Sequence, residues 1–165
     1  MIRIGIIGDI GSGKSFVAKQ FGLPIFNADK EVKKIYTKNK KCYRKFKNLF
    51  PNHISSFPIN KKELAKIILK KKNNIKKINK IVHPEVRINL KKFLKKNRKR
   101  KAVILDIPLL IENNLNKKND ILIFVQTNKK NINKRIKKRL NLKVLKILEK
   151  FQLPMKIKKK KADFI

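Results

Sequence analysis

Residues 2–15 read Ile-Arg-Ile-Gly-Ile-Ile-Gly-Asp-Ile-Gly-Ser-Gly-Lys-Ser, an apolar run that leads directly into the pattern G-x-x-x-x-G-K-[ST]. This pattern predicts a phosphate-binding loop, because its glycines let the backbone curl until successive N–H groups point at phosphate oxygens. Lys14 reaches the outer phosphates, and the Ser15 hydroxyl is a Mg²⁺ ligand. Residues 16–21 predict a helix that ends at Gly22, and its N-terminus adds a dipole favourable to anions. A Gly-rich turn with a chance lysine does not explain this order, so we expect the chain to bind a nucleoside triphosphate.

The length and composition of the chain limit the kind of protein it can be. Its 165 residues suffice for one domain with a substantial core, and no Gly/Ser-rich or Pro-rich linker divides them. The single cysteine, Cys42, excludes an internal disulfide framework, and His53 and His83 are too few for a Cys/His zinc site. The first apolar run is too short for a signal peptide, and no run reaches the length of a membrane span. We therefore expect a cytoplasmic protein that is a monomer.

The formal net charge of +37 is the most extreme feature of the composition. Such a charge usually indicates a nucleic acid or an anionic membrane as partner. Here most of the 47 basic residues are lysines, and Asn and Ile are also abundant, which is the signature of AT-rich codons. Proteins that read nucleic acids usually rely on arginine for bidentate contacts. We therefore expect no specific nucleic acid and no membrane as partner, only adventitious, salt-sensitive binding to RNA or DNA.

The apolar runs of the chain predict an α/β fold. Five short runs read as parallel strands that are covered on both faces, as in a doubly wound sheet: residues 2–7, 23–26, 102–105, 121–125 and 162–165. Residues 30–98 contain helical patterns and no convincing core strand, so they read as a helical insertion. Within it, Pro84 suits the first turn of a helix. Residues 131–150 form a further helical stretch, with Arg135 and Arg139 on one face.

Two aspartates directly follow predicted strands. Asp29 comes after the run 23–26, where a carboxylate can orient an attacking hydroxyl and accept its proton; it can equally cap a helix that starts at Lys30. Asp106 ends the run 102–105, where phosphate-loop enzymes place a carboxylate that acts on Mg²⁺; it can also be an ordinary turn residue. From the residues alone, both alternatives stay open for each aspartate.

Three further residues are candidates with a plain structural alternative. His83 precedes Pro84, and burial habits alone favour a packing or helix-start histidine. Arg135 and Arg139 are one helical turn apart, so both guanidinium groups can close over a triphosphate. In so basic a chain, a solvated basic helix explains these arginines as well.

Taken together, these stretches resemble the dephospho-CoA kinase family over nearly the whole chain. Residues 6–15 resemble its nucleotide loop, and residues 27–29 resemble its Asp-Ala-Asp motif. Val82-His83-Pro84 is similar to its His-Pro motif, and residues 106–112 are similar to its Pro-Leu-Leu-x-Glu segment. Lys134-Arg135 with Arg139, residues 152–154 and residues 162–165 resemble its lid region and the start of its last strand. The phosphate loop alone is not specific, but this set of motifs in this order is.

The resemblance implies a fold and an activity. The fold is a phosphate-loop kinase fold, in which helices flank a parallel sheet. A helical substrate-binding insertion and a small helical lid are added to this core. In this single domain the core covers about 1–29, 99–126 and 161–165, the insertion about 30–98 and the lid about 127–155. The activity is the ATP-dependent phosphorylation of the 3′-hydroxyl of dephospho-CoA, the last step of coenzyme A synthesis, with ATP and Mg²⁺.

The resemblance also implies a set of site residues. Asp29 becomes the base and Lys14 a catalytic contact to the phosphates, while the dephospho-CoA side is lined or shaped by His83, Pro108 and Glu112. Ser15 and Asp106 become the Mg²⁺ candidates. The ATP-binding residues are Gly8, Asp9, Ile10, Gly11, Ser12, Gly13, Lys14, Ser15, Phe16, Arg135 and Arg139.

The sequence departs from the family pattern at three points. Asp9 stands where the family usually has glycine, which adds a carboxylate beside a polyanion, and Asn27 replaces the first Asp of Asp-Ala-Asp. The chain ends at Ile165, before the family's terminal loop and helix, which lowers the expected stability. The alternatives are another small-molecule or nucleotide kinase of the same fold, or a decayed, non-catalytic basic protein that binds nucleotides or nucleic acid.

Overall fold

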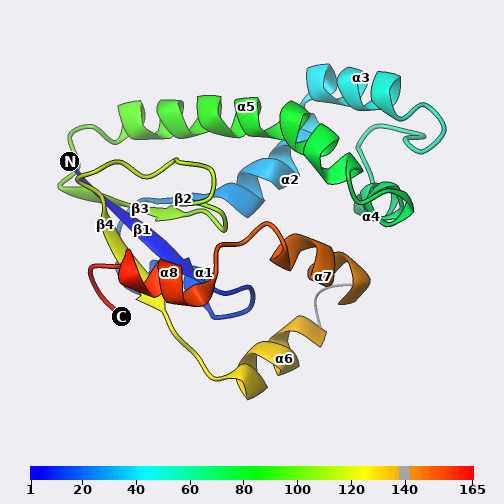
Figure 1. Cartoon of the computed structure of the whole chain (residues 1–165). Coiled ribbons are helices and arrows are strands. Elements are labelled where there is room, and N and C mark those ends of the chain that lie inside the picture. The colour runs from blue at the N-terminus through cyan, green and yellow to red at the C-terminus, as the bar shows by residue number, and fades with distance from the viewer. Residues whose placement is uncertain (138–141) are drawn as a thin grey trace. The chain divides into compact units, whose positions relative to one another are not determined.

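A computed structural model describes residues 1–137 and 142–165 of the chain (Figure 1). Strands and helices alternate at both ends of the sequence, and helices alone fill the middle. The elements are β1 (Ile2–Gly8), α1 (Lys14–Gln20), β2 (Ile25–Asn27), α2 (Ala28–Lys38), α3 (Lys40–Leu49), α4 (Lys61–Lys70), α5 (Asn74–Lys96), β3 (Ala102–Asp106), β4 (Ile121–Val125), α6 (Lys129–Lys137), α7 (Leu142–Glu149) and α8 (Met155–Lys160).

The four strands form one parallel sheet in the order β2-β3-β1-β4. β1 pairs with β3 on one side and with β4 on the other, and β2 pairs with β3. The predicted α/β fold with a parallel sheet is confirmed. Because all strands run the same way, the residues that follow β1, β2 and β3 lie at one edge of the sheet, where ligands bind in folds of this type.

Both faces of β1 are buried, as its continuous apolar run predicts. Ile6 packs with Ala18 of α1 and Ile104 of β3 in a cluster in which each is fully buried. On the opposite face Gly5 leaves no room for a side chain, since a Cβ there would lie 2.4 Å from Leu110 and 2.8 Å from Leu122. The loop after β3 therefore packs directly onto the sheet, with β1 as its floor.

The last predicted strand, 162–165, is wrong in its extent. Phe164 makes a single parallel bridge to Ile123 of β4, and no longer ladder is found there among the described residues. The chain leaves α8 only at Lys161, and the Asp163 side chain accepts the Leu122 N–H at 2.7 Å, a group that would otherwise belong to a strand ladder. The second strand is also displaced from 23–26 to Ile25–Asn27, because Pro24 has no N–H for the ladder.

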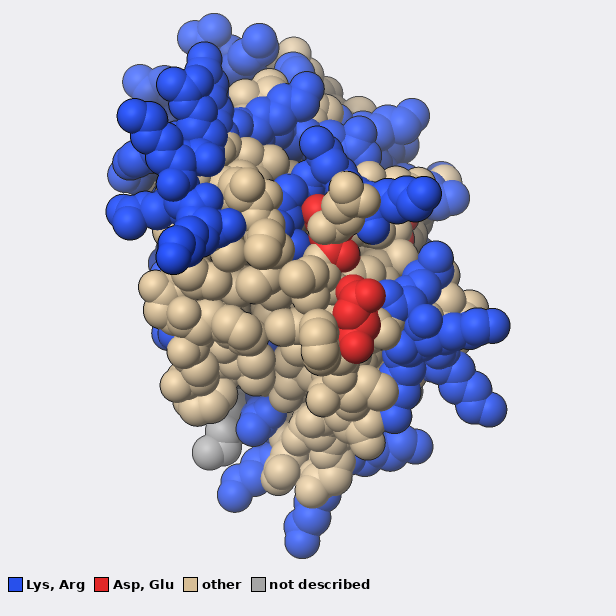
Figure 2. Space-filling model, turned by 90° about the vertical axis from the view of Figure 1, so that its left-hand side faces the viewer, with Lys and Arg blue, Asp and Glu red and all other residues tan. Residues whose placement is uncertain are grey.

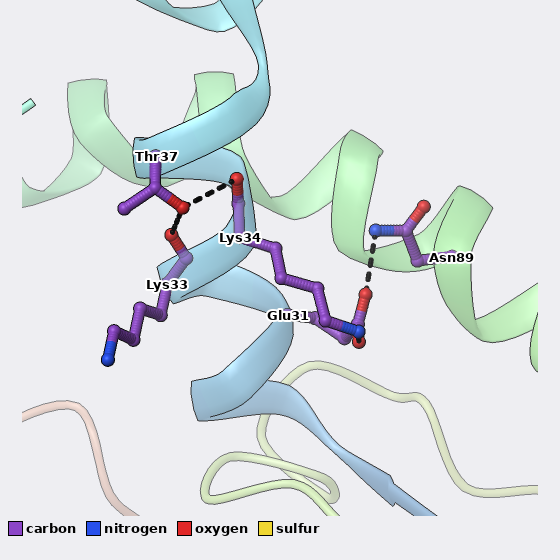
Figure 3. Close-up of polar contacts among 5 residues, drawn as sticks. All are labelled: Glu31, Lys33, Lys34, Thr37 and Asn89. Atoms are coloured by element: carbon purple, nitrogen blue, oxygen red, sulfur yellow. Dashed lines mark hydrogen bonds and ion pairs between the residues drawn. The ribbon is translucent and has the colours of Figure 1, made fainter. Parts of the chain in front are cut away.

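The chain divides into two compact units, one made of residues 1–28 and 93–165 and the other of residues 29–92. The second unit is helical, as predicted for the insertion. Within it, Glu31 of α2 accepts a hydrogen bond from Asn89 of α5 at 3.0 Å and pairs with Lys34 at 2.6 Å (Figure 3). Asn39 likewise donates to Glu85 at 3.2 Å. These polar contacts fix α2 against α5.

Pro84 does not lie in the first turn of a helix, as expected, but inside α5. Its ring removes one backbone donor, which ordinarily breaks a helix interior. An apolar stripe continues on both sides of it, with Ile78, Val82, Val86 and Leu90 all buried at helical spacing. Burial of this stripe outweighs the lost hydrogen bond, and so one long helix forms.

In the face drawn in Figure 2, lysine and arginine side chains gather at the top, the right and the bottom, whereas the centre and the left are mostly uncharged, with a few acidic groups near the centre. None of the helices in the described parts of the chain combines the length and the apolar character required to cross a membrane.

Candidate active site

The phosphate loop connects β1 to α1 and depends on its glycines. Gly8, Gly11 and Gly13 have φ values of 144°, 79° and 105°, a region that side chains rarely adopt. At Gly8 a Cβ would also lie 2.7 Å from the carbonyl oxygen of Val125. Gly13 is the N-cap of α1, and its carbonyl accepts the N–H groups of Phe16 and Val17 at 2.9 and 3.1 Å. The loop and the helix N-terminus thus form one concave anion site.

Lys14 is folded back over this loop. Its side chain is buried, and Nζ donates to the carbonyl of Asp9 at 2.6 Å and to that of Gly8 at 3.2 Å. These carbonyls offset the cost of removing an ammonium group from water. Ser15 and Phe16 follow in the first turn of α1 and are exposed, so their side chains are open to solvent beside the loop.

Arg135 of α6 reaches the same loop from the other side. Its Nη1 donates to the carbonyls of Gly11 and Ser12, both at 3.1 Å, and lies close to Gly13. Two predicted ATP ligands that are far apart in sequence, Lys14 and Arg135, therefore converge on one loop. Arg139 lies outside the described residues.

Asp9 lies in the phosphate loop, and its carboxylate bonds to the backbone of the next residue. Its Oδ1 accepts the N–H of Ile10 at 2.7 Å, so this amide is already engaged by a negative charge. A pocket lies beside these two residues, and α6 and α7 form its other walls. Its lining consists of Asp9, Ile10, Lys129, Ile132, Asn133, Leu142, Leu145 and Glu149.

Asp106 ends β3 and is 3% exposed. It stands opposite Asn27 at the end of β2, and its carboxylate accepts a hydrogen bond from the Asn27 side chain. Asn27, one of the departures from the family pattern, thus holds this carboxylate at the edge of the sheet. Among the described residues no three His, Cys, Asp or Glu side chains gather as a metal site. Ser15 and Asp106 fit Mg²⁺ as hard oxygen donors, which this ion combines with water and phosphate oxygens.

Pro108 and Glu112 lie in the loop that follows Asp106. Pro108 is half-buried, whereas the Glu112 side chain is 9% exposed and pairs with Lys158 of α8 at 2.7 Å. Glu112 also accepts the backbone N–H of Leu153 at 3.0 Å. Removing one partner of such a buried pair costs about 3–5 kcal/mol. Sequence reasoning missed Lys158, because it is one of six basic or apolar residues in a lysine-rich run and no spacing marks it out.

Asp29 and His83 belong to the second unit. α2 begins at Ala28, so Asp29 is exposed inside the first turn and is not the N-cap, which overturns the capping alternative. His83 is half-buried on α5, as expected of a packing histidine. Burial and, to a smaller extent, the positive charge of Arg87 lower the pKa of its imidazole. The ring is therefore neutral at neutral pH, and it can donate through one nitrogen and accept through the other.

A phosphate loop at the edge of a parallel sheet, with a lysine and a distant arginine on it, defines the class of phosphate-loop kinases. Residues 2–165 match the sequence model of the family described as dephospho-CoA kinase. The chain belongs to the dephospho-CoA kinase family. It is a kinase, and its family implies ATP as a substrate.

Curated relatives and one solved structure carry the same family name, and a second solved structure is similar in sequence and fold. A dephospho-CoA kinase from a Wolbachia endosymbiont of Brugia malayi is 33% identical over 98% of this chain and 86% of its own length. The enzyme from Fusobacterium nucleatum is 34% identical over the same shares. A crystal structure from Thermus thermophilus superposes with a TM-score of 0.78 at 30% identity, over 99% of this chain and 86% of that one. The structure of dephospho-CoA kinase from Campylobacter jejuni superposes with a TM-score of 0.64 at 26% identity, also over 99% of this chain and 86% of that one.

Proposed function

We propose that this chain transfers the γ-phosphoryl group of ATP to the 3′-hydroxyl of dephospho-CoA, which yields coenzyme A and ADP. The observation that carries the proposal is the convergence of Lys14 and Arg135 on the phosphate loop in a chain that matches the family over residues 2–165. The enzyme we propose acts as a cytoplasmic monomer on small molecules. No specific nucleic acid or membrane is part of the proposal.

The donor half of the site consists of the phosphate loop and Arg135. Backbone N–H groups of the phosphate loop and of the N-terminus of α1 hold the phosphates, and Lys14 exchanges its bonds to loop carbonyls for bonds to phosphate oxygens. Arg135 neutralises charge on the transferred group. Ser15 and Asp106 would hold Mg²⁺, which would neutralise negative charge on the phosphates.

In the acceptor half of the proposed site, Asp29 is the base. Asp29 orients the 3′-hydroxyl and takes its proton, while the oxygen forms a bond to the γ-phosphorus and the bond to the leaving ADP breaks. The neutral imidazole of His83 and the ring of Pro108 contact dephospho-CoA. Glu112 shapes the same side through the loop that carries Pro108.

The test is ADP release by the purified chain with ATP and dephospho-CoA, compared with the Asp29→Asn variant. We expect kcat to fall by about 10²- to 10⁴-fold while the thermal unfolding midpoint is unchanged, because Asp29 is exposed. Glu31→Gln is the matched control, since it removes a carboxylate from the same turn of α2 but keeps its acceptor oxygen for Asn89.

Two outcomes would contradict the proposal. An unchanged rate for Asp29→Asn would remove the proposed base. Release of ADP that a nucleoside monophosphate or shikimate stimulates more than dephospho-CoA would make the chain another small-molecule kinase of this fold.

A further inference from the structure

The pair of Glu112 and Lys158 joins three separate parts of the first unit. Lys158 is 1% exposed, the most buried charged side chain of the described residues, and its Nζ lies 2.7 Å from Glu112 Oε1. The same oxygen accepts the backbone N–H of Leu153 at 3.0 Å. One carboxylate oxygen thus holds the loop after β3, the segment before α8 and α8 itself together.

This junction lies at one end of the segment that carries Arg135. The segment leaves the sheet after β4, where Val125 pairs with Gly8 at the start of the phosphate loop. It runs through α6 and α7 and returns at Leu153, which is bound to Glu112. Arg135 lies between these two ends and donates to the loop carbonyls of Gly11 and Ser12. Leu142, Leu145 and Glu149 of α7 line one pocket together with Ile132 and Asn133 of α6. α7 therefore lies beside the helix that carries Arg135, and whatever fixes Leu153, just after α7, bears on the position of α6.

We propose that Glu112 and Lys158 are positioning residues that set the affinity for ATP: by fixing Leu153 they hold α7 beside α6, so that Arg135 reaches the phosphate loop. The net charge of +37 gives no reason to bury one more lysine, and burying an ammonium group is costly without a precisely placed partner. The burial of Lys158 against Glu112 therefore indicates a specific positioning role for this pair. The inference rests on the proposed function only in assigning Arg135 to the phosphates.

The experiment measures ATP binding by calorimetry without an acceptor, so it remains readable even if dephospho-CoA is not phosphorylated. Lys158→Met is compared with Lys156→Met, which removes the same charge from an exposed position of the same helix. A second variant, Glu112→Gln with Lys158→Met, leaves no uncompensated buried carboxylate and keeps an acceptor for the Leu153 N–H. If Lys158→Met alone does not fold, ATP binding is measured with this double variant instead. Thermal unfolding establishes that each variant is folded.

We expect both Lys158 variants to weaken ATP binding about tenfold and Lys156→Met to leave it unchanged. The fold-loss in ATP affinity of a variant that combines Lys158→Met with Arg135→Ala should be smaller than the product of the two separate losses. The reason is that an arginine which no longer reaches the loop contributes little to binding, so its removal costs little more. A merely structural pair would not show this coupling. Folded Lys158 variants that bind ATP like the unaltered chain, or losses that multiply with that of Arg135→Ala, would overturn the inference.

Discussion

Asp9 is a carboxylate in a loop whose other groups favour anions. Its Oδ1 occupies the N–H of Ile10, so a triphosphate meets both a negative charge and one amide that is already engaged. Two charges a few ångströms apart near a protein surface repel by a few kcal/mol at most, since solvent screens them. Asp9 is therefore expected to lower the affinity for ATP without preventing binding.

Replacing Asp9 by Asn should tighten ATP binding about three- to tenfold, because the amide oxygen still accepts the Ile10 N–H but the charge is gone. Calorimetric titration with ATP at low and at high salt measures the effect, which should shrink as salt rises. Equal affinity for the two proteins at low salt would mean that the carboxylate does not act on the bound phosphates.

The positions of the phosphate loop after β1 and of Asp106 at the end of β3 could be predicted from sequence because their signals are local. A glycine pattern after an apolar strand specifies the loop, and the topology of parallel strands places the ends of β1 and β3 at one edge. The roles of Glu112 and Lys158 could not be predicted in this way. Their contact joins residues 46 positions apart, and one lysine in a run of lysines has no pattern that reveals its burial.

Elements were predicted best where the apolar pattern is long and worst where short-range rules compete with packing. All four strands of the sheet were located, although β2 is displaced and residues 162–165 make one bridge only. In α5 the local rule for proline favoured a new helix start, but the buried stripe on both sides of Pro84 decides the structure. Tertiary burial overrides propensity here because the helix is amphipathic along its whole length.

The position of Pro84 inside α5 leads to a prediction for this helix. Because Pro84 is exposed and interrupts the backbone ladder, Pro84→Ala should raise the free energy of unfolding by about 2 kcal/mol. Urea unfolding measures the change, and Lys91→Ala, at another exposed position of α5, is the control. We also expect kcat/KM for dephospho-CoA to fall, since Pro84 directly follows His83 in α5 and an alanine there changes the backbone hydrogen bonding around this histidine.

A less stable Pro84→Ala variant would contradict this prediction. It would show that the missing N–H of Pro84 costs little and that the proline ring itself contributes to stability.

At the scale of the whole molecule, two kinds of anion attraction have to be separated. The phosphate loop is a small site with directed donors, whereas the net charge of +37 creates a diffuse field over the surface, part of which Figure 2 shows. Salt screens the diffuse field strongly and acts less on buried, directed contacts. The dependence of binding on salt therefore separates one kind of attraction from the other.

Raising NaCl from about 0.05 to about 0.2 M should reduce the affinity for a random single-stranded RNA by a factor of about 10³ or more, because such binding comes from released counterions. The affinity for ATP should fall far less, since loop amides, Lys14 and Arg135 bind it. Fluorescence anisotropy with labelled RNA and calorimetry with ATP give the two curves. The thermal unfolding midpoint should rise over the same range, because screening relieves repulsion among the lysines. RNA binding that persists at high salt would instead show directed contacts with RNA, and nucleic-acid binding would then be a function of the chain and not a result of its composition.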